Sequence, residues 1–247
     1  MVRALPPLPR LEGVVEMLDR AGNSDEEVRG SLRDLEQFNR YFGGLRTVLL
    51  HLRRMVGAGP QNPIAILDIA TGGADIPRAI CGWARARNLA VTVEALDWND
   101  QVLAAAAEWS ANYPEIRFCR AEVPPLDYPD KSFDLVVSSL FFHHLSEAQG
   151  IRLLREMARI ARRGLVVNDL LRSRPARFLT AITTRLLSAN RLTRHDGPVS
   201  VLRGFRPKEL LRMATEAGLT DVTLSFHPWF RIALTKEIAL SAQERTA

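Results

Sequence analysis

The 247-residue sequence has only two cysteines, Cys81 and Cys119, and they lack the spacing of metal ligands. Two isolated thiols are typical of a reducing compartment and give no indication of a zinc site. No apolar run reaches the roughly 18 residues that a membrane-spanning helix needs. The first 13 residues contain three prolines where a secretory signal would have its apolar core. We therefore expect a cytoplasmic protein.

Acidic residues are scarce in one segment of the chain. Residues 170–212 hold ten lysines and arginines against two acids, a net charge of +8 in a chain whose total is +5. The remainder is accordingly neutral to acidic. A basic block of this kind is compatible with a solvated face, a nucleic acid, an anionic membrane or an acidic substrate. Composition alone leaves these possibilities open.

Patterns of strand and helix length alternate along most of the chain. Three helical patterns occupy residues 8–57. From residue 64 onward, strands are expected at 64–69, 91–96, 116–118, 133–138 and 164–168, and helices near 75–87, 99–111 and 146–162. This alternation is typical of βαβ units, in which helices cover both faces of a parallel sheet.

A long interruption at 170–206 separates the fifth strand from the last elements. A helix is expected from Pro207 to Ala217, and "DVTLSF" and "FRIALTK" then indicate a hairpin that adds an antiparallel edge. We predict an α/β fold with a doubly wound, mostly parallel sheet. A helical N-terminal cap would occupy 1–60, and the main domain would occupy 61–247 with a lid insertion at 170–206.

The stretch "AILDIATGGADIP" places an acid inside a buried strand. Asp68 is costly there unless something pairs with it. Thr71, Gly72 and Gly73 follow, and glycines permit a tight turn and a close approach of backbone to a ligand. A helix is expected from Ala74, so its free N–H groups would face the same space. The stretch indicates a site for a charged small molecule.

Polar residues also follow the other strands. Asp97 ends the second strand, Glu122 follows the third, and Ser138 ends the fourth, while Asn168 and Asp169 end the fifth. Ligands of open parallel sheets bind outside the carboxyl ends of the strands. We therefore expect these side chains to share one site.

In this order the residues resemble the class I S-adenosylmethionine-dependent methyltransferases, over roughly residues 64–237. "PDKSFDLVVSSLFFHHL" and "ARRGLVVNDLLR" look like the branch that contains quinone-biosynthesis and other small-molecule methyltransferases. The resemblance implies a Rossmann-like seven-stranded sheet that ends in the antiparallel hairpin. It also implies S-adenosylmethionine as the cofactor.

The resemblance assigns roles to the matched positions. Asp68 and the turn that follows it would flank the methionine part of the cofactor, and Asp97 would accept hydrogen bonds from both ribose hydroxyls. The expected cofactor-binding residues are Asp68, Ala70, Thr71, Gly72, Asp75, Asp97, Trp98, Glu122, Val123 and Ser138.

The chain departs from the family pattern at three places. The first and third glycines of the turn are Ala70 and Ala74, and alanine permits close packing but disfavours a positive φ. Glu122 stands where aspartate is commoner, which adds one methylene of reach.

A nicotinamide cofactor is the alternative that an acid after the second strand would also suit. No G-x-G-x-x-G follows the first strand, however, and Asp75 lies where a pyrophosphate would need open N–H groups. A carboxylate such as Asp68 is electrostatically better placed beside a sulfonium-bearing amino acid than beside a diphosphate.

Methylation of a hydroxyl requires removal of its proton, and histidine suits this near neutral pH. His143 and His144 follow the fourth strand, although one of two adjacent histidines is expected to pack beneath the loop. His195 is a third candidate because its long insertion has the length of a lid or binding loop. A surface turn is the alternative for His195.

The motifs of several acceptor classes are missing after the fourth strand. The Asn/Asp-Pro-Pro-aromatic motif of nucleic-acid base methylation and the paired glutamates of protein arginine methylation do not occur there. Asn168 and Asp169 are too few hard ligands for magnesium. We expect no metal, no nucleic acid and a small apolar acceptor, with Phe141, Phe142 and Phe205 as candidate pocket walls.

O-methylation of a phenol, quinol or polyketide-like hydroxyl is the leading hypothesis for function. C-methylation of a quinone precursor is second, because the similar branch includes it. A non-catalytic binding or assembly factor is the third hypothesis, although the acids at 68, 97 and 122 argue for cofactor binding. The sequence does not define the acceptor or the oligomeric state.

The basic insertion contains an amphipathic helical pattern. Phe178, Leu179, Ile182 and Leu186 form an apolar stripe, surrounded by arginines at 174, 177, 185, 191 and 194. Such stripes mostly pack on their own domain. The alternative is a lid that contacts an anionic membrane to collect a lipid-like phenol or quinol.

Overall fold

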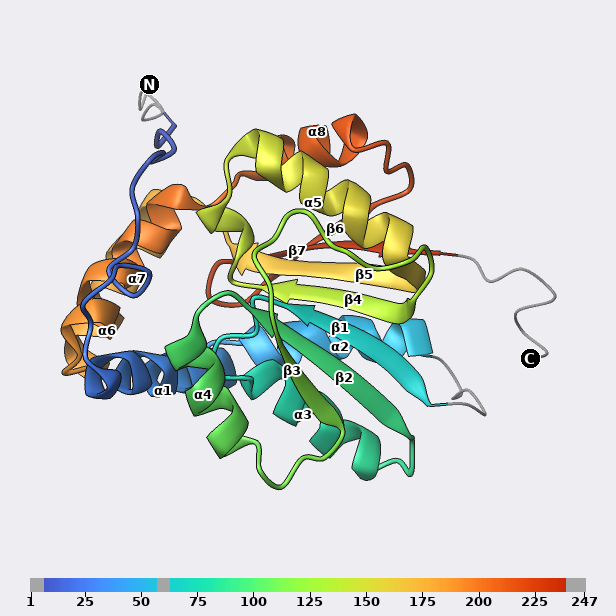
Figure 1. The fold of residues 1–247 in the computed structure, drawn as a ribbon. Coiled ribbons are helices and arrows are strands. Elements are labelled where there is room, and N and C mark those ends of the chain that lie inside the picture. Colours follow the sequence, from blue (N-terminus) through green and yellow to red (C-terminus); the bar gives the residue numbers. More distant parts are fainter. Residues whose placement is uncertain (1–6, 57–62, 239–247) are drawn as a thin grey trace.

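One seven-stranded sheet organises the computed structural model, which describes residues 7–56 and 63–238. The strands lie in the order β3-β2-β1-β4-β5-β7-β6 (Figure 1). Their bounds are β1 (Ile64–Ile69), β2 (Val91–Asp97), β3 (Ile116–Arg120), β4 (Phe133–Ser139), β5 (Ala161–Leu170), β6 (Thr223–His227) and β7 (Arg231–Glu237).

Strands β1 to β5 pair in parallel, whereas β7 pairs antiparallel with both β5 and β6. The order reverses between β1 and β4, so the crevice at the carboxyl ends of these strands is the expected ligand position. The predicted mostly parallel sheet with an antiparallel C-terminal hairpin is confirmed.

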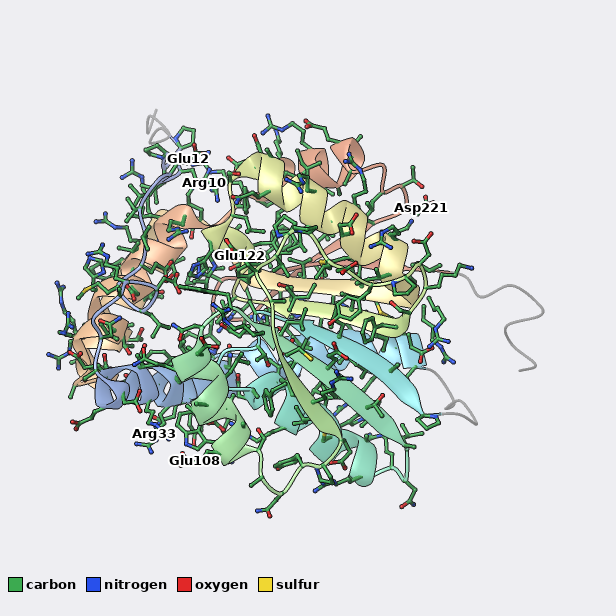
Figure 2. The ribbon with its side chains drawn as sticks, in the orientation of Figure 1. Arg10, Glu12, Arg33, Glu108, Glu122 and Asp221 are labelled. Carbon is green, nitrogen blue, oxygen red and sulfur yellow. The ribbon has the colours of Figure 1, made fainter. Side chains whose placement is uncertain are left out.

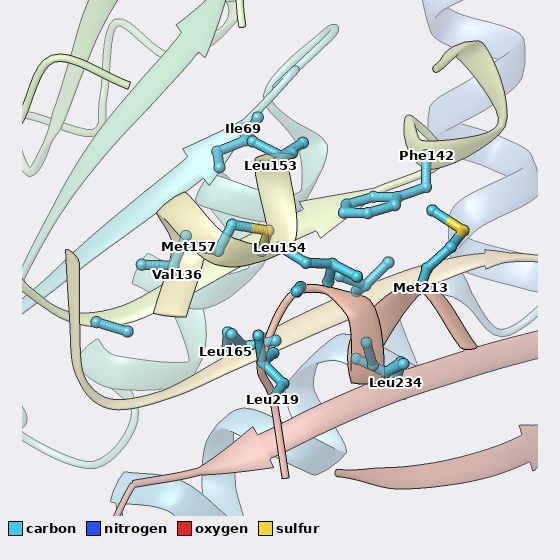
Figure 3. Close-up of a cluster of buried hydrophobic side chains, with 14 of the residues drawn as sticks. Ile69, Val136, Phe142, Leu153, Leu154, Met157, Leu165, Met213, Leu219 and Leu234 are labelled. Carbon is cyan, nitrogen blue, oxygen red and sulfur yellow. The ribbon is translucent and has the colours of Figure 1, made fainter. Parts of the chain in front are cut away.

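Helices cover both faces of the sheet (Figure 1). Side chains of α2 and α3 form a buried cluster with one face, and those of α5 and α8 form another with the opposite face (Figure 3). The helices are α1 (Asp25–Tyr41), α2 (Gly44–Val56), α3 (Asp75–Arg85), α4 (Asp100–Trp109), α5 (Glu147–Ile160), α6 (Arg174–Leu187), α7 (Arg191–Arg203) and α8 (Pro207–Glu216), with a short 3₁₀ helix η1 (Phe142–His144).

Several expected boundaries differ from the structure by one to three residues, and the start of β5 differs most. The helix predicted to end near residue 162 ends at Ile160, and β5 begins at Ala161 instead of 164. Within this extra length of strand, Arg163 and Arg162 both reach the carboxylate of Asp134 on β4, at 3.0 and 3.4 Å. These charge contacts between neighbouring strands favour the earlier start of β5, and hydrophobic periodicity does not reveal them.

The N-terminal region contains two helices within its described residues, not the three that the periodicity predicted. Residues 8–20, here called the N-terminal strap, run as irregular chain along α7 (Figure 1). Asp196 of α7 accepts hydrogen bonds from the backbone N–H groups of Met17 and Leu18 at 2.7 and 2.9 Å. Together with α1, α6 and α7, the strap forms a lid beyond the carboxyl ends of the strands.

The predicted division at residue 60 falls on residues outside the described ranges, and it stays a prediction. Helix α2 belongs to the predicted cap, yet Val48, Leu52 and Val56 share a core with β1 and α3. The lid that faces the strand ends is therefore built from the strap, α1 and the 170–206 insertion.

Candidate functional site

A cavity of about 550 Å³ lies between the carboxyl ends of the strands and the lid. Its lining includes residues that follow β1, β2, β3 and β4, and also residues of the strap, α1, α6, α7 and the β6–β7 turn. Its volume is that of a small-molecule site.

The turn between β1 and α3 forms one wall of the cavity. Thr71 N–H donates to the Leu96 carbonyl at 2.7 Å, and Ala74 N–H donates to the Thr71 carbonyl at 3.0 Å. Ala70 and Ala74 adopt φ of 57° and 58°, the left-handed conformation that alanine was expected to disfavour. These hydrogen bonds hold the turn in the glycine-type conformation although two of its glycines are replaced.

Asp68 lies buried at the end of β1 and lines the cavity. Burial raises the pKa of its carboxyl to about 7. Its Oδ2 atom has no hydrogen-bond partner among the described residues. An uncompensated buried carboxylate is costly, so this acid is suited to a cationic or hydrogen-bonding ligand in the cavity.

Asp97 ends β2, and it is nearly buried. Its Oδ2 accepts from Gly72 N–H at 3.0 Å and its Oδ1 accepts from Asn99 N–H at 3.1 Å, which orients the carboxylate at the cavity wall. Trp98 and Glu122 also line the cavity, and both are exposed. Figure 2 shows Glu122 beyond the end of β3.

Arg231 is a cavity residue that sequence reasoning missed. It is buried at the start of β7, and its Nη2 donates to Asn39 Oδ1 of α1 at 3.1 Å. Its Nη1 lacks a hydrogen-bond partner within the described part of the chain. Burial lowers the pKa of this guanidinium to about 10, so it remains charged. Asp75 interacts electrostatically with both Arg231 and Asp68, which places acids and a cation in one neighbourhood.

Both adjacent histidines line the cavity, and the short helix η1 after β4 carries them. His143 is buried, as expected for one of the pair, yet its ring meets a carboxylate. Its Nδ1 lies 2.6 Å from Asp169 Oδ1, and its backbone N–H donates to Asp169 Oδ2 at 2.9 Å. Nδ1 of His144 lies 2.9 Å from Asp19 Oδ2 on the strap.

Glu16 of the strap completes this cluster, and no local pattern in the sequence indicated it. Its Oε1 lies 3.5 Å from His143 Nε2, and its Oε2 lies 3.7 Å from His144 Nε2. Burial raises the pKa of Glu16 to about 7. The Arg203 guanidinium lies nearby and donates to the carbonyls of both histidines, at 3.2 and 3.0 Å, which fixes the position of η1.

Four candidate residues lie elsewhere than expected. Among the described residues Ser139, not Ser138, lines the cavity, because the Ser138 hydroxyl turns toward the Ile69 carbonyl. His195 lies outside the cavity lining, and its exposed ring contacts Asp196.

The remaining two of the four are aromatic. Phe142 and Phe205 are buried in the core on the α5 side instead of lining the cavity, whereas Phe141 lines it. The neighbouring rings of Phe141 and Phe142 therefore point to different sides of the chain, and only the Phe141 ring faces the cavity.

Comparison with known families identifies the central part of the chain. Residues 66–164 match the family described as a methyltransferase domain. This segment is similar to a methyltransferase domain. It spans β1 to the start of β5 and therefore contains the turn after β1, Asp97, Glu122 and both histidines of η1. The strap, α1 and the lid helices lie outside the matched segment. No curated protein sequence matches the chain significantly.

Solved methyltransferase structures share the fold at low sequence identity. An S-adenosylmethionine-dependent methyltransferase from Aquifex aeolicus is 16% identical, with a TM-score of 0.59, over 85% of this chain and 98% of its own. An O-methyltransferase family 2 protein from Planctomyces limnophilus, in complex with apigenin, is 14% identical with a TM-score of 0.61, over 90% of this chain. The CurJ carbon methyltransferase is 13% identical with a TM-score of 0.64, over 91% of this chain. The chain spans only 63% of each of the last two proteins.

The cavity fits S-adenosylmethionine. The amino-acid part of that molecule carries an ammonium, a carboxylate and a sulfonium. Asp68 offers an unpaired buried carboxylate oxygen to the cations, and Arg231 offers an unpaired N–H to the carboxylate, both counted within the described residues. We therefore take S-adenosylmethionine as the cofactor of this domain.

No helix within residues 7–56 and 63–238 is long and apolar enough to cross a membrane.

Proposed function

We propose that this protein transfers the methyl group of S-adenosylmethionine to a hydroxyl of a small apolar acceptor, a phenol, quinol or polyketide-like compound. The observation that carries the proposal is the cluster of Glu16, His143 and His144 in the same cavity as Asp68 and Asp97. A hydroxyl acceptor must lose its proton for the transfer, and this cluster is the place where the proton can leave.

The cofactor would lie along the strand ends in this proposal. Asp97 would bind the ribose hydroxyls, with Trp98 and Glu122 near the adenine. Asp68 and the β1–α3 turn would hold the methionine part, with Arg231 as partner of its carboxylate. These residues all line one cavity, and the first four lie at or just after the carboxyl ends of β1, β2 and β3.

His143 is the best-placed proton acceptor of the three candidate histidines. Asp169 holds its Nδ1, so Nε2 is directed toward Glu16 and the cavity. A carboxylate that orients a histidine and stabilises its protonated form is a recurring arrangement in proton transfer. In the transfer itself, the acceptor O–H bond breaks, the new O–CH₃ bond forms and the S–CH₃ bond of the cofactor breaks.

The acceptor end of the cavity is apolar. Leu35 and Phe38 of α1, Phe42 just after it, and Phe141 after β4 contribute to its lining, together with Leu179 of α6. These side chains favour an aromatic or alkyl-substituted acceptor over a charged one. The apigenin complex of the Planctomyces protein, a fold relative, is consistent with a phenolic acceptor.

A product analysis tests this function. The protein is incubated with S-adenosylmethionine that carries a ¹³C-methyl group and with a panel of phenols and quinols of increasing alkyl length. We expect a product with a methoxy ¹³C signal. A signal for methyl on a ring carbon would establish the second hypothesis, C-methylation, and would contradict the proposal. Cofactor binding without any methylated product across the panel would favour the third, a non-catalytic role.

We further propose that α6 brings the lid into contact with an anionic membrane. Part of its apolar face is open to solvent, since Phe178, Leu186 and Leu187 are 65, 77 and 59% exposed. Exposed arginines at 177 and 185 lie on the same helix. Leu179 and Thr183 of α6 line the cavity, so a lipid-like acceptor would enter beside the surface that contacts the membrane.

Two arginines of α6 provide the test of this contact. The Arg177→Gln, Arg185→Gln variant is expected to bind phosphatidylserine vesicles roughly 30-fold more weakly, at about 1 kcal/mol for each basic residue near the surface. Cosedimentation at low salt measures this, and binding should fall as salt rises. Arg191 is unsuitable because it pairs with Glu27 of α1 at 2.5 Å.

Arg152 and Arg155 of α5 supply a matched control, because both are exposed and lie outside the lid. Their replacement by Gln removes the same charge and should leave vesicle binding unchanged. Equal losses in the two double variants, or no binding of the wild type at low salt, would contradict the membrane proposal.

A further inference from the structure

The clustered side chains after β4 have the geometry of a metal site. One oxygen of Glu16 faces Nε2 of His143 at 3.5 Å, and the other faces Nε2 of His144 at 3.7 Å. One ligand atom from each of the three residues lies within 4.8 Å of the others. Ligands about 2.1 Å from a tetrahedral cation are separated by about 3.4 Å, so these distances leave room for one ion between them.

Both histidines are oriented as metal ligands are. Nδ1 of His143 lies 2.6 Å from Asp169 Oδ1, and Nδ1 of His144 lies 2.9 Å from Asp19 Oδ2. A ligating histidine commonly donates its other N–H to a carboxylate, which fixes the tautomer and directs the free nitrogen at the metal. Here the same arrangement occurs twice, and the two carboxylates come from distant segments, β5 and the N-terminal strap.

With Glu16 ionised and both rings neutral, the cluster is unsatisfied without a positive charge at its centre. When Nδ1–H of each histidine donates to its carboxylate, the Nε2 lone pairs of neutral rings face the oxygens of Glu16, which is repulsive. Glu16 is 5% exposed, and its Oε1 has no hydrogen-bond partner among the residues described. Arg203 Nη1 forms an ion pair with that oxygen at 3.6 Å, which is beyond hydrogen-bond distance.

We infer that Glu16, His143 and His144 bind a divalent transition-metal cation at the acceptor end of the cavity. Two imidazole nitrogens and one carboxylate suit zinc, iron(II), cobalt(II) or manganese(II) rather than magnesium, which prefers oxygen ligands. Three protein ligands leave a coordination position open toward the cavity, as in catalytic rather than structural sites. The expectation of a metal-free site considered the cysteine spacing and the carboxylates after β4 and β5, and it did not consider a histidine pair with a distant glutamate.

The cation would act on the acceptor hydroxyl, and this consequence rests on the proposed function. A hydroxyl oxygen bound at the open position has its pKa lowered, so its proton leaves to solvent and the oxygen can attack the methyl group. His143 Nε2 is then a ligand and accepts no proton itself. The binding site is independent of this step, because metal binding is measurable without an acceptor.

Zinc and cobalt binding to the full chain tests the inference. The protein is purified without a polyhistidine tag, treated with a chelator and titrated with Zn²⁺ by calorimetry. We expect one ion per chain. Glu16→Gln and His144→Ala should weaken binding by at least about 100-fold, and Asp19→Asn by roughly 10–100-fold through loss of orientation. Co²⁺ in the wild type should give the visible absorption bands of a four- or five-coordinate site, so the test does not depend on the variants folding.

Two histidine variants serve as matched controls. His195 lies outside the cavity lining, and His227 meets His51 with an Nε2–Nε2 distance of 3.1 Å at the other histidine pair of the described chain. Replacement of either His195 or His227 by Gln should leave zinc affinity unchanged.

Three results would overturn the inference. They are no zinc binding by the wild type, zinc binding only at a site that His227→Gln abolishes, and zinc binding by Glu16→Gln and His144→Ala that equals that of the wild type. Failure to methylate phenols would leave the binding results intact and would count against the proposed function alone.

Discussion

Replacement of Asp97 by alanine is expected to reduce affinity for S-adenosylmethionine by more than about 100-fold. Two charge-assisted hydrogen bonds to the ribose hydroxyls would be lost, together on the order of 3 kcal/mol. The carboxylate is already oriented by Gly72 and Asn99 N–H groups, so little further ordering opposes binding in the wild type. Calorimetric titration with S-adenosylmethionine measures the change, and circular dichroism checks that the variant remains folded.

Asp100 provides the matched control for this experiment. It begins α4, and its exposed carboxylate pairs with Arg120 at 3.1 Å outside the cavity lining. Exposed pairs contribute little to stability, so Asp100→Ala should bind the cofactor as the wild type does. Unchanged affinity in a folded Asp97→Ala variant would refute the proposed position of the ribose.

Replacement of His143 by alanine is expected to reduce methyl transfer by roughly 10²–10⁴-fold while S-adenosylmethionine still binds. The loss is expected whether the ring takes the proton of the acceptor or holds a cation that lowers the pKa of its hydroxyl. His143 follows β4, whereas Asp97 ends β2 and Glu122 follows β3, so the adenosine part of the site would remain intact. Single-turnover rates with saturating cofactor separate the chemical step from binding.

His195→Ala is the control for the chemistry, because its exposed ring lies outside the cavity lining. It should retain wild-type rates. A wild-type rate in His143→Ala would show that the acceptor arrives ionised or that carbon is methylated. A loss in His195→Ala equal to that in His143→Ala would show that the lid, and not the η1 cluster, determines turnover.

The sheet and the cofactor end of the site were predictable because their signals are local. A buried strand, a turn and a helix start define the position of Asp68, and Asp97 and Glu122 come at or just after the ends of their strands. Parallel strands bring their carboxyl ends to one edge, so sequence order alone gathers these acids. The strands could be predicted from their own hydrophobic residues, without knowing which distant residues they contact.

The acceptor end depends on contacts between distant segments, which no local pattern encodes. Glu16 and Asp19 lie in irregular chain and reach the histidines of η1, and Glu16 and His143 are 127 positions apart in the sequence. Arg231 of β7 donates to Asn39 of α1, 192 positions away. Such pairings become visible only when the strap and α1 fold over the strand ends.

The exposure of the α6 stripe was also beyond sequence reasoning. Periodicity identified Phe178, Ile182 and Leu186 as one face, but it does not reveal whether that face meets the domain or solvent. In the structure the cavity side of α6 carries Leu179 and Thr183, which leaves Phe178 and Leu186 outside.

A crystal structure of the protein with S-adenosylhomocysteine tests the central claim most directly. The account predicts the ribose hydroxyls on Asp97, the amino-acid part between Asp68 and Arg231, and the sulfur directed toward the space bordered by the η1 histidines and the strap. A product bound with its sulfur directed away from that cluster, or bound outside this cavity, would contradict the account.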